Sequence, residues 1–83
     1  MHRIPRDISG RELAGLLNKY GYIIVRQTSS YIRLVSRFKH KEHKITIPDH
    51  QVIKIGTLNN ILNEVAEYLK KSKQDLIKDL FNQ

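Results

Sequence analysis

A lone tyrosine is the first candidate for chemistry in this sequence, Tyr31 in the stretch VRQTSSYIRL of residues 25–34. It follows a short cluster of hydroxyl residues and lies between two arginines, Arg26 and Arg33. A phenol in such surroundings can stack on a base, donate a hydrogen bond to a phosphate oxygen, or simply lie on the surface. Whether Tyr31 takes part in a reaction therefore decides whether this protein is an enzyme or a binding protein.

Histidines are the other candidates, because an unperturbed imidazole changes charge near pH ~6.5. The chain has four, at positions 2, 40, 43 and 50. We expect His2 to lie in a disordered end, and His40 and His43 to be solvated partners of a phosphate backbone beside a basic hairpin tip. The simplest interpretation of His50 is a loop histidine that orders its turn. Without cysteine or a histidine pair at i,i+4 spacing, the sequence predicts no metal and no cofactor.

Basic residues are concentrated in the first two-thirds of the chain. Residues 1–54 contain 11 Lys and Arg against 4 Asp and Glu, whereas residues 55–83 contain 4 of each. The net charge of +7 therefore falls entirely on the first segment. Lys and Arg release counterions when they bind phosphates, so this asymmetry favours nucleic acid, or an acidic protein that competes with it, as partner. A purely solubilising charge is the alternative.

The remaining composition is that of a small intracellular domain. The absence of cysteine fits a reducing compartment, and no apolar run approaches the ~20 residues of a membrane span. The first ten residues contain no signal-peptide core. We therefore expect a cytoplasmic protein that has no membrane partner.

Hydrophobic periodicity predicts the elements that position Tyr31. A helix is predicted over residues 9–20, where Ser9 and Glu12 can form a capping box and Gly21 follows the last turn. Three strands follow, and then two helices. The strands are predicted over residues 22–27, 30–38 and 43–48, the second helix from Gly56 and Thr57 onward, and a third, short helix over residues 72–82.

This order predicts an α+β fold. Short links favour an antiparallel three-stranded sheet, and the helices are the only available cover for its apolar face. The order α-β-β-β-α, with an additional C-terminal helix, is double-stranded-RNA-binding-like. We expect one domain over residues 1–83, with its core over about 4–70.

Alternation along the second strand assigns its faces. Ile32, Leu34 and Phe38 are predicted to point inward, and Tyr31, Arg33, Val35 and Arg37 outward. The predicted outer surface is therefore basic and interrupted by an aromatic ring, as suits the phosphates and splayed bases of RNA. Its proposed RNA-binding residues are Arg26, Ser30, Tyr31, Arg33, Arg37, Lys39, Lys41 and Lys44. A solvated strand face is the alternative for each charge taken alone.

Four blocks of the sequence resemble, in order and spacing, the HicA family of toxin–antitoxin mRNA interferases. They are IPRDISGRELAGLL, GYIIVRQ, ITIPDH and IGTLNNIL, between about Ile4 and Leu69. The resemblance implies a double-stranded-RNA-binding fold, binding of mRNA in single-stranded or structured form, cleavage without metal, and silencing by a HicB-like antitoxin.

The family's catalytic histidine falls on Tyr31, and its usual glycine falls on Ser29. Tyrosine side chains have a pKa near ~10, so only on the order of 0.1% is ionised at pH 7 and the group is a poor base. The resemblance leaves Tyr31 as a group that positions or protonates the phosphate, and His50 as the best remaining base.

Three functions stay open. The first is a HicA-like ribonuclease toxin, and the second is a catalytically silent relative that binds RNA or the antitoxin as a regulator. A DNA-binding regulator is disfavoured, because no helix concentrates the basic and amide side chains of a recognition helix. The apolar C-terminal segment also suggests a homodimer or an antitoxin contact through Tyr68, Leu80 and Phe81.

Overall fold

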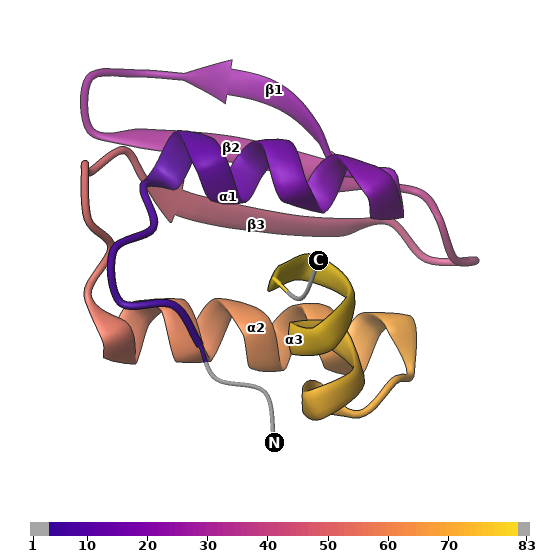
Figure 1. The fold of residues 1–83 in the computed structure, drawn as a ribbon. Helices are drawn as coiled ribbons and strands as arrows, with labels where there is room; N and C mark the ends of the chain where they lie inside the picture. The colour runs from indigo at the N-terminus through magenta and orange to yellow at the C-terminus, as the bar shows by residue number, and fades with distance from the viewer. Residues whose placement is uncertain (1–3, 82–83) are drawn as a thin grey trace.

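The fold, in a computed structural model that describes residues 4–81, is a three-stranded antiparallel sheet with helices packed against one face (Figure 1). This confirms the predicted α+β class and the order of its elements. The elements are α1 Gly10–Leu17, a 3-10 turn η1 Asn18–Tyr20, β1 Ile23–Gln27, β2 Tyr31–Ser36, β3 His43–Pro48, α2 Ile55–Leu69 and α3 Lys73–Phe81. His2 lies outside the described residues.

The predicted capping box starts α1. The Glu12 amide donates to the Ser9 hydroxyl, and the Ser9 amide donates to the Glu12 carboxylate, each at 3.0 Å. Gly21 ends the η1 turn with a φ of 81°, in the left-handed region that glycine adopts without strain. These local signals fix where the first helix begins and where the chain turns into β1.

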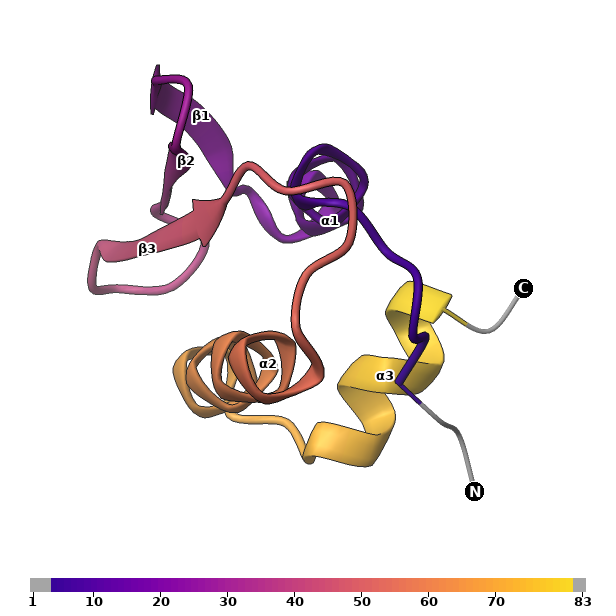
Figure 2. The same cartoon turned by 90° about the vertical axis from the view of Figure 1, so that its left-hand side faces the viewer.

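The sheet has the order β1-β2-β3, so β2 is central and β1 is an edge strand. The register of β1 against β2 shifts between Ile24 and Arg26, which leaves Val25 as a bulge. All three helices lie on one side of the sheet, and no described element covers the other side (Figure 2). The outer face that carries Tyr31 and Arg33 is therefore free of the chain's own helices.

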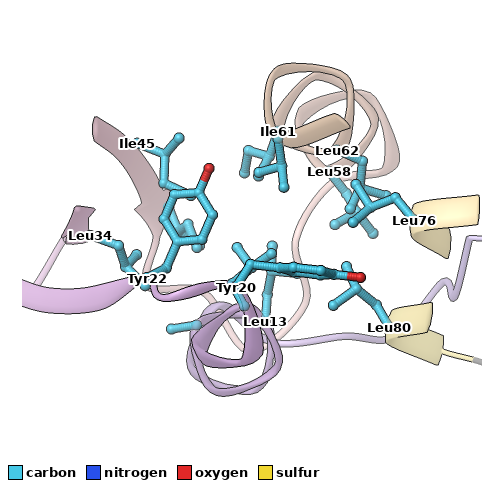
Figure 3. Close-up of a cluster of buried hydrophobic side chains, with 14 of the residues drawn as sticks. Leu13, Tyr20, Tyr22, Leu34, Ile45, Leu58, Ile61, Leu62, Leu76 and Leu80 are labelled. Atoms are coloured by element: carbon cyan, nitrogen blue, oxygen red, sulfur yellow. The ribbon is translucent and has the colours of Figure 1, made fainter. Parts of the chain in front are cut away.

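The core lies between the sheet and the helices. Tyr22 is fully buried, and its ring lies between Leu34 and Ile45 of the sheet and Ile61 of α2 (Figure 3). Leu80 of α3 belongs to the same hydrophobic cluster. The remaining members of this cluster are chiefly the apolar stripes of α1 and α2, with Leu76 and Ile77 of α3.

One predicted orientation in the second strand is wrong. Phe38, predicted to point inward, is 57% exposed, whereas Val35 keeps its outward position in line with Tyr31 and Arg33 although it is 7% exposed. The cause is Ser36, which is fully buried and ends β2. Its hydroxyl donates to the Tyr20 carbonyl at 2.8 Å and accepts from the Phe38 amide at 3.1 Å, so the chain turns before Phe38 can continue the alternation.

The C-terminal helix is anchored to the rest of the fold. The Ser72 hydroxyl accepts from the Asp75 amide at 3.0 Å, as the predicted capping residue should. The Tyr20 hydroxyl donates to the Asp79 carboxylate at 2.7 Å, and the Lys71 ammonium contacts the same carboxylate. Leu80 is 2% exposed, so it is not available for the homodimer or antitoxin contact predicted for it. Within residues 4–81, no helix combines the length and apolar character that crossing a membrane requires.

Candidate nucleic-acid interface

A tight turn positions Tyr31 at the start of β2. The Thr28 hydroxyl accepts hydrogen bonds from the amides of Ser30 at 3.1 Å and Tyr31 at 3.2 Å. The Thr28 amide in turn donates to the Tyr31 carbonyl at 2.9 Å. Side chain and backbone of Thr28 thus hold the turn closed. The Tyr31 side chain, half-buried, is therefore attached to a backbone that is fixed on both sides.

The end of β3 and the start of α1 meet this turn. Tyr31 pairs with Pro48 across the sheet, and the Asp49 amide donates to the Ser30 carbonyl at 3.0 Å. The Gly10 amide donates to the His50 carbonyl, also at 3.0 Å. His50 therefore lies at the same end of the molecule as Tyr31, with its side chain exposed. The two predicted catalytic residues share one end of the sheet, although no contact joins their side chains.

Arg11 and Asp49 form an ion pair at this end. Nε of Arg11 lies 3.3 Å from Oδ1 of Asp49, and Nη2 lies 3.5 Å from Oδ2. The Asp49 side chain is 13% exposed, whereas that of Arg11 is 73% exposed. The arginine can therefore reach a ligand while it neutralises a carboxylate that would otherwise repel phosphate. Sequence reasoning missed both residues; the only available signal was the position of Asp49 beside His50.

Two arginines face each other across the sheet beside Tyr31. Arg26 of β1 pairs with Arg33 of β2, and residues directly opposite in a sheet project to the same face. The Arg33 guanidinium also lies 5.8 Å from the centre of the Tyr31 ring. Like charges in opposite positions destabilise a sheet. An anion between them removes that repulsion, so this pair is suited to a phosphate group.

The amino-acid sequence matches the model of a known family, described as HicA toxin of bacterial toxin–antitoxin, over residues 10–67. This is more than half of the chain, from the start of α1 to near the end of α2. The chain belongs to the HicA toxin family. The match supports the resemblance of the four sequence blocks and gives the chain the role of a toxin in such a system. No curated protein and no solved structure matches the chain.

In this HicA-family chain, the predicted basic surface separates into two parts. Arg26, Ser30, Tyr31 and Arg33 lie at the end just described. Arg37 and Lys44 are instead paired with Glu42, at 2.7 Å and 3.8 Å respectively. Lys39 and Lys41 follow in the loop between β2 and β3. The second part is thus partly neutralised by its own carboxylate, whereas Arg26 and Arg33 form no ion pair within the described residues.

His43 is not the solvated residue that its position beside the basic loop predicted. Its Nδ1 is hydrogen-bonded to the Tyr22 hydroxyl at 2.6 Å, and its ring stacks on Tyr68 with centroids 4.8 Å apart. Burial, the largest cause, raises the pKa of the Tyr22 phenol well above its usual value. His43 is therefore a packing residue of the HicA fold. His40 is exposed in the loop, as predicted.

Among the described residues 4–81, no three His, Asp or Glu side chains are grouped so that they could hold a metal ion. The metal-free chemistry expected from the resemblance remains a prediction, because the arrangement of carboxylates and imidazoles does not test it. The groups available at the Tyr31 end are a phenol, an imidazole and three guanidinium groups. These groups can bind a phosphate and move protons.

Proposed function

We propose that this HicA-family toxin binds mRNA at the Tyr31 end of its sheet and cleaves it without a metal, and that a HicB-like antitoxin controls it. The observation that carries the proposal is the opposed pair Arg26 and Arg33 beside an aromatic ring. Phosphates neutralise the guanidinium groups of Arg26 and Arg33, and an unstacked base can lie against Tyr31. Single-stranded segments of mRNA offer both groups together.

Cleavage at this end requires two proton transfers. The 2′-hydroxyl oxygen attacks the neighbouring phosphorus, and the bond from phosphorus to the 5′-oxygen breaks. His50 takes the proton of the 2′-hydroxyl, and the Tyr31 phenol gives its proton to the departing 5′-oxygen. Arg33 and Arg26 stabilise the additional negative charge on the phosphate oxygens as the bond forms. The products are a 2′,3′-cyclic phosphate and a free 5′-hydroxyl.

The second candidate function is a catalytically silent relative that binds RNA or the antitoxin as a regulator. What favours it is the phenol at Tyr31, in the position where the resemblance to the family implies a catalytic histidine. General acid–base catalysis contributes about a hundred- to ten-thousandfold to a rate, so loss of an effective base leaves at most weak cleavage. RNA binding through Arg26 and Arg33 survives that loss.

Three proteins separate the two functions: the native chain, Tyr31→Phe and Tyr31→His, each incubated with the same RNA in the presence of EDTA. Cleavage by the native chain with loss in Tyr31→Phe supports a toxin that uses its phenol. A gain of cleavage only in Tyr31→His supports the silent relative. Equal cleavage by the native and Phe proteins contradicts the assignment of Tyr31.

Binding is tested by its dependence on salt. We expect Arg33→Gln to weaken RNA binding and to reduce the slope of log K against log salt by about one, because one phosphate contact is lost. Arg37→Gln is the matched control, since Arg37 directly follows the same strand but is paired with Glu42. Equal slopes for Arg33→Gln and the native protein would show that the phosphates bind elsewhere.

A further inference from the structure

The edge strand β1 presents three consecutive apolar residues to solvent. Ile23 and Ile24 are each 51% exposed, and Val25 is 53% exposed. Successive residues of a strand point to opposite faces, so this exposure covers both sides of the strand. Protein edges are usually protected by charges, proline or a covering element. Here the described residues provide only the bulge at Val25 and the charge of Arg26, which leaves most of the edge open.

A groove runs between this strand and α1. Its volume is about 460 Å³, and it is lined by Arg11, Ala14, Gly15, Asn18, Tyr22, Ile23 and Ile24. The α1 residues in this set repeat at intervals of three and four, so they form one face of the helix. A Cβ atom placed on Gly15 would meet nothing within 4 Å, so the groove is open above this glycine. The groove accepts an apolar side chain that arrives beside β1.

Positive charge surrounds both the strand and the groove. Arg26 continues β1 beyond Val25, and Arg11 stands at the groove with most of its side chain exposed. The chain carries a net charge of +7, so a second copy would bring like charges together. A segment with acidic side chains gains attraction from the same field. Charge thus selects an acidic occupant over another copy of this chain.

We propose that β1 and its groove bind an extended segment of an acidic partner protein, which adds a fourth strand to the sheet and inserts an apolar side chain beside Gly15. Main-chain hydrogen bonds to the open edge provide affinity, and the groove and arginines provide selectivity. This proposal deepens the antitoxin part of the proposed function and rests on it for the biological identity of the partner.

Arg11 links this surface to the nucleic-acid end. The same guanidinium lines the groove and pairs with Asp49, whose amide is bonded to the turn that holds Tyr31. An acidic side chain seated in the groove competes with Asp49 for Arg11. The released Asp49 carboxylate then presents an unneutralised negative charge at the Tyr31 end of the sheet. Occupation of the groove therefore weakens RNA binding without covering Tyr31.

A phage-displayed library of random twelve-residue peptides tests the surface directly. Peptides are selected on the native protein and compared on two variants, Ile24→Arg and Val52→Arg. Val52 is the matched control, because it is 53% exposed and lies outside β1. We expect the selected peptides to alternate apolar and acidic residues, to bind the native protein and Val52→Arg equally, and to bind Ile24→Arg at least ~10-fold more weakly, a loss of about 1.4 kcal/mol.

Several results overturn the proposal. They are failure to enrich any peptide, enrichment of basic or uncharged peptides, and equal binding to the native protein and Ile24→Arg. Self-association of the native chain in sedimentation velocity that is abolished by Ile24→Arg would assign the surface to a second copy instead. Circular dichroism and amide hydrogen exchange check that Ile24→Arg is folded, and added protection of the Ile23–Gln27 amides by a selected peptide locates the bound strand.

RNA binding, measured on the same proteins, separates this proposal from the proposed function. We expect Ile24→Arg to retain RNA binding, because Ile24 faces the groove and not the arginine pair. Peptide binding without RNA binding would contradict the proposed function and support the interaction surface. If the protein binds RNA but peptide binding does not depend on Ile24, the interaction surface is contradicted and the proposed function is supported.

Discussion

Gly10 and Gly15 lie in the same helix but should respond oppositely to the same substitution. A Cβ atom on Gly10 would lie 2.2 Å from the Pro48 carbonyl oxygen and 3.2 Å from the carbonyl carbon, whereas one on Gly15 would meet nothing within 4 Å. The obstacle at Gly10 is backbone, which cannot rotate away as a side chain can. The oxygen and the new methyl group must move apart by close to an ångström, so α1 and the end of β3 have to separate.

The expected magnitudes follow from these distances. Overpacking of this kind costs ~1–3 kcal/mol, so Gly10→Ala should lower the free energy of unfolding by that amount. Gly15→Ala should raise it by ~0.5–1 kcal/mol, because alanine loses less conformational entropy in a helix than glycine does. For a domain of this size, a change of 1 kcal/mol shifts Tm by about 4–8 °C. The two variants should therefore melt on opposite sides of the native protein.

Urea unfolding followed by circular dichroism at 222 nm measures both free energies, with thermal melts as an independent check. The m-value should stay constant if each variant retains the native fold. Gly10→Ala should also reduce RNA binding, since it displaces the Pro48–His50 segment from the turn beside Tyr31. A Gly10→Ala protein as stable as the native one would refute the close approach of α1 to β3, and with it the geometry of the candidate site.

Two further predictions concern residues distant from that site. Contact with Lys71, the largest cause, and the hydrogen bond from Tyr20 lower the pKa of Asp79. A lowered folded-state pKa gives stability that is present above the unfolded value of about 4 and is lost as pH falls through the folded value. Acid titration of unfolding should therefore show Asp79→Asn converging on the native stability below about pH 4. The Tyr68 hydroxyl accepts from the Lys39 amide at 2.9 Å and donates to the Lys41 carbonyl at 2.5 Å. Tyr68→Phe should therefore speed hydrogen exchange of the Lys39 amide by about fivefold, for a hydrogen bond worth ~1 kcal/mol, and equal exchange would contradict this anchor.

Local signals allowed much of the fold to be predicted, because each acts over a few residues. Ser9 and Glu12 are three positions apart, and their capping box has the geometry that this spacing requires. The alternation predicted for the second strand failed at Phe38, beyond the end of β2, where a tertiary contact took precedence over it. The bond from Ser36 to the Tyr20 carbonyl joins residues 16 positions apart, and no local pattern marks Ser36 as the point where the strand ends.

Like the fold, the candidate site was predictable where its residues lie close together in the sequence. Tyr31 and Arg33 could be grouped from the sequence because they lie on one strand, where spacing alone assigns a common face, whereas Arg26 joins them through the pairing of β1 with β2. Arg11 and Asp49 were missed because they are 38 positions apart and meet only after α1 packs against the end of β3. His43 was misread for the opposite reason: a sequence of Lys, His and Glu suggests solvent, but Tyr22 and Tyr68 approach from distant elements and enclose the ring.

The distribution of charge suits one small sheet to the two proposed ligands. Near Tyr31, Arg26 and Arg33 are opposed without a carboxylate between them, so this end gains most from a mobile anion such as a phosphate. At the far end, Glu42 already offsets one of the two positive charges of Arg37 and Lys44. The open edge of β1 pairs with a ligand whose backbone carries N–H and C=O groups in the spacing of a strand. A peptide has such a backbone and a polynucleotide does not. On these proposals RNA and an acidic protein segment bind adjacent but different surfaces, and Arg11 connects the two because it lines the groove and pairs with Asp49 at the Tyr31 end.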